Sequence, residues 1–115
     1  MLNKMRTHFF AMALACLALL ATSSPANAQN RVVKIVNEAS TPIYHLYVTN
    51  VGESDWGSDQ LELYETIGPY HYRVFNMDDG SGYCLFDIRV VLSDGRVATR
   101  LNFNVCTQSS WTVTD

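Results

Sequence analysis

Carboxylate side chains gather in two stretches of the sequence that lack a periodic apolar pattern, residues 50–60 and 76–82. These carboxylates belong to Glu53, Asp55, Asp59, Asp78 and Asp79. Ca²⁺ takes six or more oxygen ligands, usually with several carboxylates among them, and two neighbouring loops can supply such a set. The spacing matches no calcium-binding loop, however, and Asp-Asp-Gly-Ser-Gly at 78–82 is typical of a turn. We therefore assign no metal and no cofactor, and expect the two loops to contribute to a binding surface.

Aromatic residues lie close to these carboxylates in the sequence. Trp56 follows Asp55, and Tyr70 opens the run Tyr70-His71-Tyr72. Indole and phenol rings offer a large amphipathic area on which a sugar or a peptide can stack. Two facts argue for a simpler role: a loop tryptophan often covers the end of a core, and alternation places His71 and Tyr72 on opposite faces of a strand. The predicted ligand-binding residues are Trp56, Asp55, Asp59, Asp78, Asp79 and Tyr70.

Residues suited to acid–base or nucleophilic catalysis are few. After residue 28 the only histidines are His45 and His71, and both fall within predicted strands rather than loops. The sequence has no G-x-S-x-G serine nucleophile motif, no His-x-x-x-His pair and no phosphate-binding glycine loop. We therefore expect a protein that is not an enzyme. A small hydrolase or lyase is the alternative, and it requires a cleft that places one of these imidazoles beside a carboxylate.

Two cysteines follow residue 28, Cys84 and Cys106. An even number of cysteines in an exported protein predicts a disulfide, because an oxidising compartment keeps thiols paired. Closing a loop of this length contributes about 3 kcal/mol by the chain-entropy relation. A reactive or metal-binding thiol pair is the alternative, but no C-x-x-C motif or neighbouring histidine supports it.

The cysteines flank a predicted β-hairpin. Residues 84–92 and 97–106 alternate between apolar and polar side chains, and Asp94-Gly95 suits a two-residue type I′ turn with positive φ at both positions. The expected pairs on the apolar face are Leu92 with Val97, Val90 with Thr99, Ile88 with Leu101 and Phe86 with Phe103. This register puts the two cysteines on opposite faces, so a disulfide requires a bulge or bend near Asn104.

Seven short segments have the composition or the alternation of β-strands. They are residues 31–37, 43–49, 61–67, 71–75, 84–92, 97–106 and 111–114. The second segment is expected to run antiparallel to the first, and a helical turn over residues 58–63 fits nearly as well as a strand over 61–67. The regular spacing predicts an all-β fold, a small antiparallel β-sandwich of about seven strands cross-linked by the disulfide. A small barrel is the alternative.

Residues 1–28 have the pattern of a secretory signal peptide. Lys4 and Arg6 precede an apolar run over residues 9–21, and Ala26-Asn27-Ala28 fits a cleavage site. Because that run is short for a membrane span, we expect no span after cleavage, with a retained anchor as the alternative. Acylation at Cys16 is a further alternative.

Residues 29–115 then form one β-sandwich domain, located in the periplasm or secreted. Six Lys and Arg residues and eleven Asp and Glu residues follow residue 28, which gives this part of the chain a net charge of −5. An acidic surface argues against nucleic acid and anionic membranes as partners. The partner we expect is an envelope protein or a small ligand.

The sequence also resembles a known family over nearly all of residues 29–115. The matching stretches are residues 37–49, 56–61, 79–91, Asp94-Gly95 and 104–106, with Gly-Tyr-Cys at 82–84 and Asn-x-Cys at 104–106 the most specific. The family consists of small bacterial periplasmic or secreted proteins with signal peptides and unknown function. Members sometimes carry the label argininosuccinate lyase, but that lyase is a large helical enzyme whose site does not fit in 87 residues of β pattern. The resemblance implies export and paired cysteines and supplies no catalytic residues.

These features predict an exported β-domain that binds a ligand or a partner protein without catalysis. The expected binding surface is the loop end that holds Trp56 and residues 78–82. The alternative is a purely structural or envelope-stress protein whose loops bind nothing.

Overall fold

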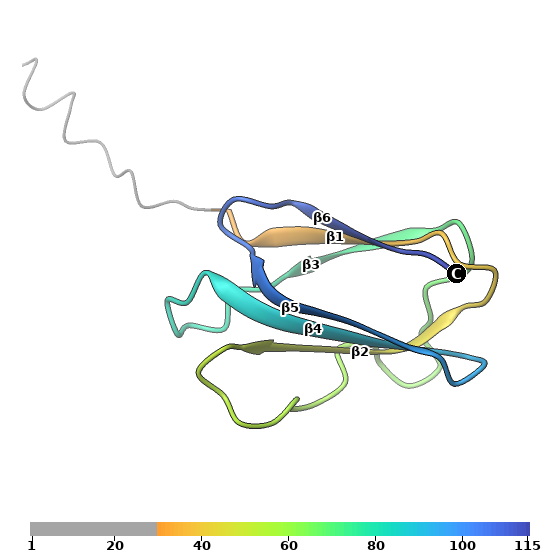
Figure 1. The fold of residues 1–115 in the computed structure, drawn as a ribbon, viewed down its shortest axis with the longest axis horizontal. Helices are drawn as coiled ribbons and strands as arrows, with labels where there is room; N and C mark the ends of the chain where they lie inside the picture. The colour runs from red at the N-terminus through yellow and green to blue at the C-terminus, as the bar shows by residue number, and fades with distance from the viewer. Residues whose placement is uncertain (1–29) are drawn as a thin grey trace, which may run out of the picture.

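Alternation of buried and exposed side chains in the strands builds two sheets that pack face to face. The computed structural model describes residues 30–115, so the signal peptide predicted for residues 1–28, with its alternatives, lies outside the described residues. The strands are β1 (Val32–Asn37), β2 (Ile43–Asn50), β3 (Tyr72–Asn76), β4 (Leu85–Leu92), β5 (Val97–Asn104) and β6 (Ser110–Val113). One sheet has the order β3-β1-β6 and the other β2-β4-β5, and Figure 1 shows them as two layers. The predicted all-β sandwich is confirmed.

The core lies between the layers. The buried side chains are Val33, Ile35 and Asn37 in β1 and Phe86, Ile88, Val90 and Leu92 in β4, and in both strands they alternate with more exposed residues. Full burial of one of these apolar side chains is worth about 1.5–3 kcal/mol relative to exposure. Within residues 30–115 no helix is long and apolar enough to cross a membrane.

Two expectations about strand pairing are wrong. β1 does not pair with β2, because the chain crosses from one sheet to the other between them; β1 is antiparallel to β3 and parallel to β6. Residues 61–67 form no strand and residues 58–63 form no helical turn; only Ile67 makes an isolated bridge, to Ile43. The fold therefore has six strands rather than about seven.

The β4–β5 turn also differs from the expected type I′ geometry. Its loop has three residues: Gly95 N–H donates to the Leu92 carbonyl (2.9 Å), and Leu92 N–H donates to the Arg96 carbonyl (2.8 Å). Gly95 has a φ of 87°, whereas Asp94 is not among the residues with positive φ. A type I turn followed by one left-handed residue explains this pattern. The extra loop residue shifts the pairs near the turn by one position.

A bulge in β5 corrects this shift. Near the turn Ile88 pairs with Arg100 rather than Leu101, but beyond the bulge Phe86 pairs with Phe103 as expected. The extra residue lies at Asn102, which has a φ of 54° and donates its N–H to Asp87 Oδ1 over 2.9 Å. Without a bulge, the one-residue shift would turn Phe103 toward solvent. The bulge leaves Phe103 2% exposed.

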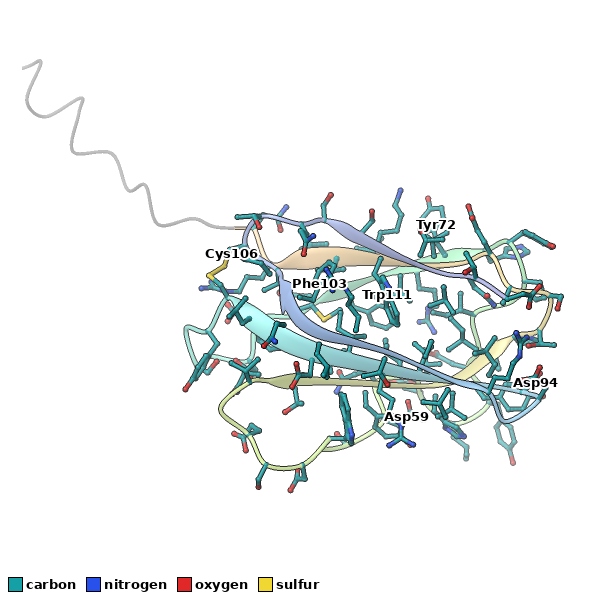
Figure 2. All side chains as sticks on the ribbon, in the orientation of Figure 1. Asp59, Tyr72, Asp94, Phe103, Cys106 and Trp111 are labelled. Carbon is teal, nitrogen blue, oxygen red and sulfur yellow. A yellow bond between two sulfur atoms is a disulfide. The ribbon has the colours of Figure 1, made fainter. Side chains whose placement is uncertain are left out.

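The Cys84–Cys106 disulfide is confirmed, with 5.3 Å between the Cα atoms. The chain turns after Asn104, whose side-chain Oδ1 accepts the Cys106 N–H (3.0 Å) and whose carbonyl accepts the Gln108 N–H (2.8 Å). This is the bend that the alternation pattern required near Asn104. It brings Cys106 beside the start of β4, at one end of the sandwich (Figure 2).

Candidate functional site

A groove of about 600 Å³ lies along the edge strand β2. It exists because the chain after β2 returns to that strand at two separate points. Gln60 N–H donates to the Leu46 carbonyl (2.7 Å), and Ile67 exchanges two hydrogen bonds with Ile43 (2.9 and 3.1 Å). Between these points residues 61–66 leave the strand edge. The groove is lined by Tyr44, His45, Asp59, Leu61, Glu62, Leu63, Tyr64, Glu65 and Thr66.

The outer wall of the groove is unusually apolar for a surface turn. Leu63 is 82% exposed and Tyr64 95% exposed, and Tyr44 on β2 is 47% exposed. Tyr64 has a φ of 67°, in the left-handed region that a bulky residue rarely adopts. The Arg73–Glu65 ion pair (2.7 Å) holds the end of this turn to β3. The strained backbone at Tyr64 and the exposed apolar side chains around it make this turn a candidate functional site.

The inner wall is shaped by a bulge in β2. The pairing with β4 shifts between Ile43 and His45, so the extra residue is Tyr44. Regular alternation would bury either Ile43 and His45 or Tyr44 and Leu46. The bulge instead buries Ile43 and Leu46 and turns both Tyr44 and His45 outward into the groove.

Asp59 joins the following loop to this wall. Its Oδ2 lies 2.7 Å from His45 Nδ1, and its Oδ1 accepts N–H bonds from Leu46 (2.9 Å) and Leu61 (3.0 Å). Partial burial raises the pKa of Asp59, but the hydrogen bonds from Leu46, His45 and Leu61 outweigh it and hold the pKa below its ordinary value. The carboxylate is therefore ionised and fully engaged in fixing the loop. Figure 2 shows Asp59 on the outer side of the β2-β4-β5 sheet, whereas Phe103 and Trp111 lie between the two layers.

A row of rings and one guanidinium continues from the groove across the outer face of the β2-β4-β5 sheet. His45 packs edge-on against Tyr44 (6.5 Å between ring centroids) and stacks on Tyr47 (6.3 Å). Arg89 Cζ then lies 6.0 Å from the centroid of Tyr47 and 6.0 Å from that of Trp56. Trp56 thus packs over the outer face of this sheet, beside Arg89. The sequence placed this tryptophan either in a binding loop or over the end of the core, and did not anticipate Arg89 beneath it.

The remaining acidic residues mainly shape their own loops. Asp55 Oδ1 accepts the Gly57 N–H (3.1 Å) and Asp78 Oδ1 accepts the Gly80 N–H (3.1 Å). Asp79 accepts hydrogen bonds from Asn50 Nδ2 (2.8 Å) and from the Ser81 N–H (3.0 Å). Partial burial raises the pKa of Asp79, yet these bonds bring it below its ordinary value. Within residues 30–115 no three His, Cys, Asp or Glu side chains converge on a point where a metal ion would bind.

The two predicted acidic loops do meet, whereas Tyr70 lies elsewhere. Asn50 ends β2, and its bond to Asp79 joins the two loops. Met77 N–H, just before the second loop, donates to the Arg31 carbonyl at the start of β1. Tyr70 N–H instead donates to the carbonyl of Asn37, the last residue of β1 (2.6 Å). The length of β1 therefore separates Tyr70 from the acidic loops.

Sequence reasoning missed the residues that form the groove wall, Tyr44, Leu63 and Tyr64. The assignment of residues 61–67 as a strand hid Leu63, because alternation would bury it on the same face as Leu61 and Ile67. One signal was present: residues 43–49 carry aromatic side chains on both predicted faces, which a strand with one buried face does not need.

Comparison of the chain with protein-family models, with curated proteins and with solved structures found no match in any of the three.

Proposed function

We propose that this protein is an exported, non-enzymatic binding module of the cell envelope, which holds a ligand or a partner protein in the groove beside β2. The observation that carries the proposal is the turn at Leu63 and Tyr64, where two large apolar side chains are 82% and 95% exposed on the wall of the groove. The Cys84–Cys106 disulfide supports an oxidising compartment. The site differs in position from the loop end that the sequence favoured, since it is centred on residues 61–66 and includes only Asp59 of the predicted set.

The lining of the groove favours a ligand with both an apolar face and hydrogen-bonding groups. Tyr44, Leu63 and Tyr64 supply contact area at low cost in side-chain entropy, and the phenol groups supply polar tips. His45 lies between them with its Nδ1 occupied by Asp59, and its Nε2 has no hydrogen-bond partner within the described part of the chain. A short peptide or a glycan fragment has this combination of surfaces.

Binding of short peptides and envelope glycan fragments, followed by the amide and indole resonances of the protein, tests the proposal. A ligand held in the groove should bind at least about tenfold more weakly to Tyr64→Ala and to Leu63→Ser than to wild type. Tyr72→Ala is a matched control, because Tyr72 is 57% exposed on the other sheet. Ligands that bind all four proteins equally, or shift resonances only outside residues 44–66, would place the binding site elsewhere.

The His45–Asp59 pair supports a second candidate, a small hydrolase. The pair meets the condition set by the sequence, since an imidazole with a side chain 49% exposed stands beside a carboxylate in a groove. The groove also holds the hydroxyls of Tyr44, Tyr64 and Thr66, although none of them is hydrogen-bonded to His45 among the described residues. Ester and peptide hydrolysis that is lost in His45→Ala and retained in His71→Ala would favour this candidate over a binding module.

A further inference from the structure

Arg89 occupies the centre of the outer face of the β2-β4-β5 sheet. It lies on the middle strand, β4, opposite Tyr47 of β2 and Thr99 of β5. The guanidinium is held between the rings of Tyr47 and Trp56, each with its centroid 6.0 Å from Cζ. Both rings favour the cation electrostatically and restrict its movement. The position of this charge is therefore fixed before any ligand arrives.

The carboxylate of Asp87 on β4 and those of Asp55 and Asp59 in the loop that carries Trp56 are engaged with other groups. Asp87, two residues away on β4, accepts the Asn102 N–H on β5. Asp59 is bonded to His45 and to two backbone N–H groups, and Asp55 accepts the Gly57 N–H. Within residues 30–115 the Arg89 guanidinium forms no ion pair, and its Nε is buried without a hydrogen-bond partner.

Each of the other arginines among the described residues is either bonded to a protein group or exposed to water. Arg73 pairs with Glu65, and Arg96 pairs with Asp94 and Asp115. Arg31 donates to the carbonyls of Gly82 and Tyr83. Arg100 is exposed, so water solvates its charge. Arg89 alone among the described arginines combines partial burial, a covered Nε without a partner and two flanking aromatic rings, so its charge is neither paired within the described residues nor fully solvated.

We propose that Arg89 forms a carboxylate-binding subsite, which takes the acid group of a ligand whose apolar or sugar body extends along Tyr47 and His45 toward the groove. The inference rests on the proposed function, because Tyr47 connects Arg89 to the groove wall through its stacking on His45. A planar guanidinium matches a carboxylate with two parallel hydrogen bonds. A carboxylate carries one negative charge, so the acidic surroundings of Asp55 and Asp59 repel it less than a phosphate dianion.

Two kinds of ligand carry such an acid group: a peptide with a free C-terminus and a glycan with a uronic acid. Two matched pairs of probes separate them: N-acetylphenylalanine with its amide, and methyl glucuronide with methyl glucoside. The readouts are the Nε–H resonance of Arg89 and the indole N–H resonance of Trp56 in the purified, disulfide-bonded protein. We expect one acid to shift both resonances and to bind at least about tenfold more tightly than its neutral partner.

Two variants of Arg89 and one control complete the test. Arg89→Met keeps an unbranched side chain between Tyr47 and Trp56 without the charge, and should bring the acid to the affinity of its neutral partner. Arg89→Lys keeps the charge without the paired donors, and its affinity for the acid should lie between those of Arg89→Met and wild type. Arg100→Met removes an exposed arginine and should bind the acid as wild type does.

The outcomes separate this subsite from the groove. The subsite is overturned if the acid binds no more tightly than its neutral partner, or if it binds Arg89→Met as tightly as wild type. This holds even when Tyr64→Ala still weakens the binding of neutral ligands in the groove. Conversely, an acid whose affinity depends on Arg89 but not on Tyr64 or Leu63 supports the subsite and argues against the groove.

Discussion

The side-chain amide of Asn37 donates a hydrogen bond of 3.0 Å to the carbonyl of Ile67, a residue 30 positions further along the chain. The same amide donates to the Thr41 carbonyl (2.9 Å), and its oxygen accepts the Ala39 N–H (2.9 Å). Asn37 is completely buried. One asparagine thus fixes both the crossover between the sheets after β1 and the point where residues 61–66 rejoin β2, so it also determines where the groove ends.

Asn37→Ala should lower the free energy of unfolding by about 3 kcal/mol, since it leaves buried carbonyl and N–H groups without partners. Urea unfolding measures this loss. Asn76→Ala is the control, because Asn76 is exposed and accepts a single N–H bond, from Asp78. Its expected loss is about 1 kcal/mol or less. Equal losses in the two variants would mean that the buried network contributes little beyond a surface turn.

Reduction of the Cys84–Cys106 disulfide should destabilise the protein strongly. The bond closes a loop with a sequence separation of 22 residues, and the chain-entropy relation assigns about 3 kcal/mol to a closure of this length. For a domain of this size that corresponds to a fall in Tm of about 10–20 °C. Thermal unfolding with and without reductant measures the effect. The double variant Cys84→Ala, Cys106→Ala should show the lower Tm in both conditions, and a Tm of wild type unchanged by reductant would contradict the prediction.

Stability should fall in acid, below about pH 4, because the pKa of Asp59 is lower in the folded state than its ordinary value of 3.8. Partial burial opposes this shift, and the hydrogen bonds from Leu46, His45 and Leu61 produce it. A group with a depressed folded pKa binds fewer protons when folded, so its contribution is complete above the unfolded pKa and is lost as the pH falls through the folded one.

The pH dependence of Tm for wild type and Asp59→Asn checks this prediction. The variant should be less stable near pH 7 and should lose less stability than wild type between about pH 4 and pH 2. Asp79, Asp94 and Asp115 also have pKa values below the ordinary one, so some acid dependence remains in the variant. Parallel curves for the two proteins would show that Asp59 does not contribute in this range.

The sequence was sufficient to predict the layers of this fold and the disulfide, because both depend on patterns that a chain of alternating residues carries locally. The exact pairing of residues between strands was harder to predict from the sequence. Asp94-Gly95 is compatible with both a two-residue and a three-residue loop, and the bulge at Asn102 hides the difference by restoring the burial of Phe103. Only long-range contacts distinguish the two registers.

The groove escaped prediction for a related reason. Its two ends are fixed by Asn37 and Asp59, whose contacts reach across 30 and 14 positions of the sequence. Nothing in residues 61–66 themselves indicates that their backbone leaves the strand edge. Asp59 was predicted as a ligand-binding residue, but in the structure both of its oxygens are bonded within the chain and hold the loop, and the exposed residues beside it are free to contact a ligand.

Tyr64→Gly should stabilise the protein and weaken binding at the groove together. The φ of 67° at Tyr64 costs a residue with a Cβ atom about 1 kcal/mol, and glycine adopts this conformation without that cost. The side chain is 95% exposed, so its removal loses little packing. Urea unfolding should therefore show a gain of up to about 1 kcal/mol, reduced by the greater freedom of glycine in the unfolded chain.

Thr66→Gly provides the comparison, since Thr66 lines the same turn without a positive φ and should only lose stability. When the two variants are titrated with any ligand found for the groove, Tyr64→Gly should bind it more weakly than Thr66→Gly, although Tyr64→Gly is the more stable variant. A strained tyrosine retained on an exposed turn is accounted for if it contacts a ligand. If Tyr64→Gly is more stable and binds as well as wild type, the strain has no role in binding, and the centre of the site must move from the turn toward Tyr44 and His45.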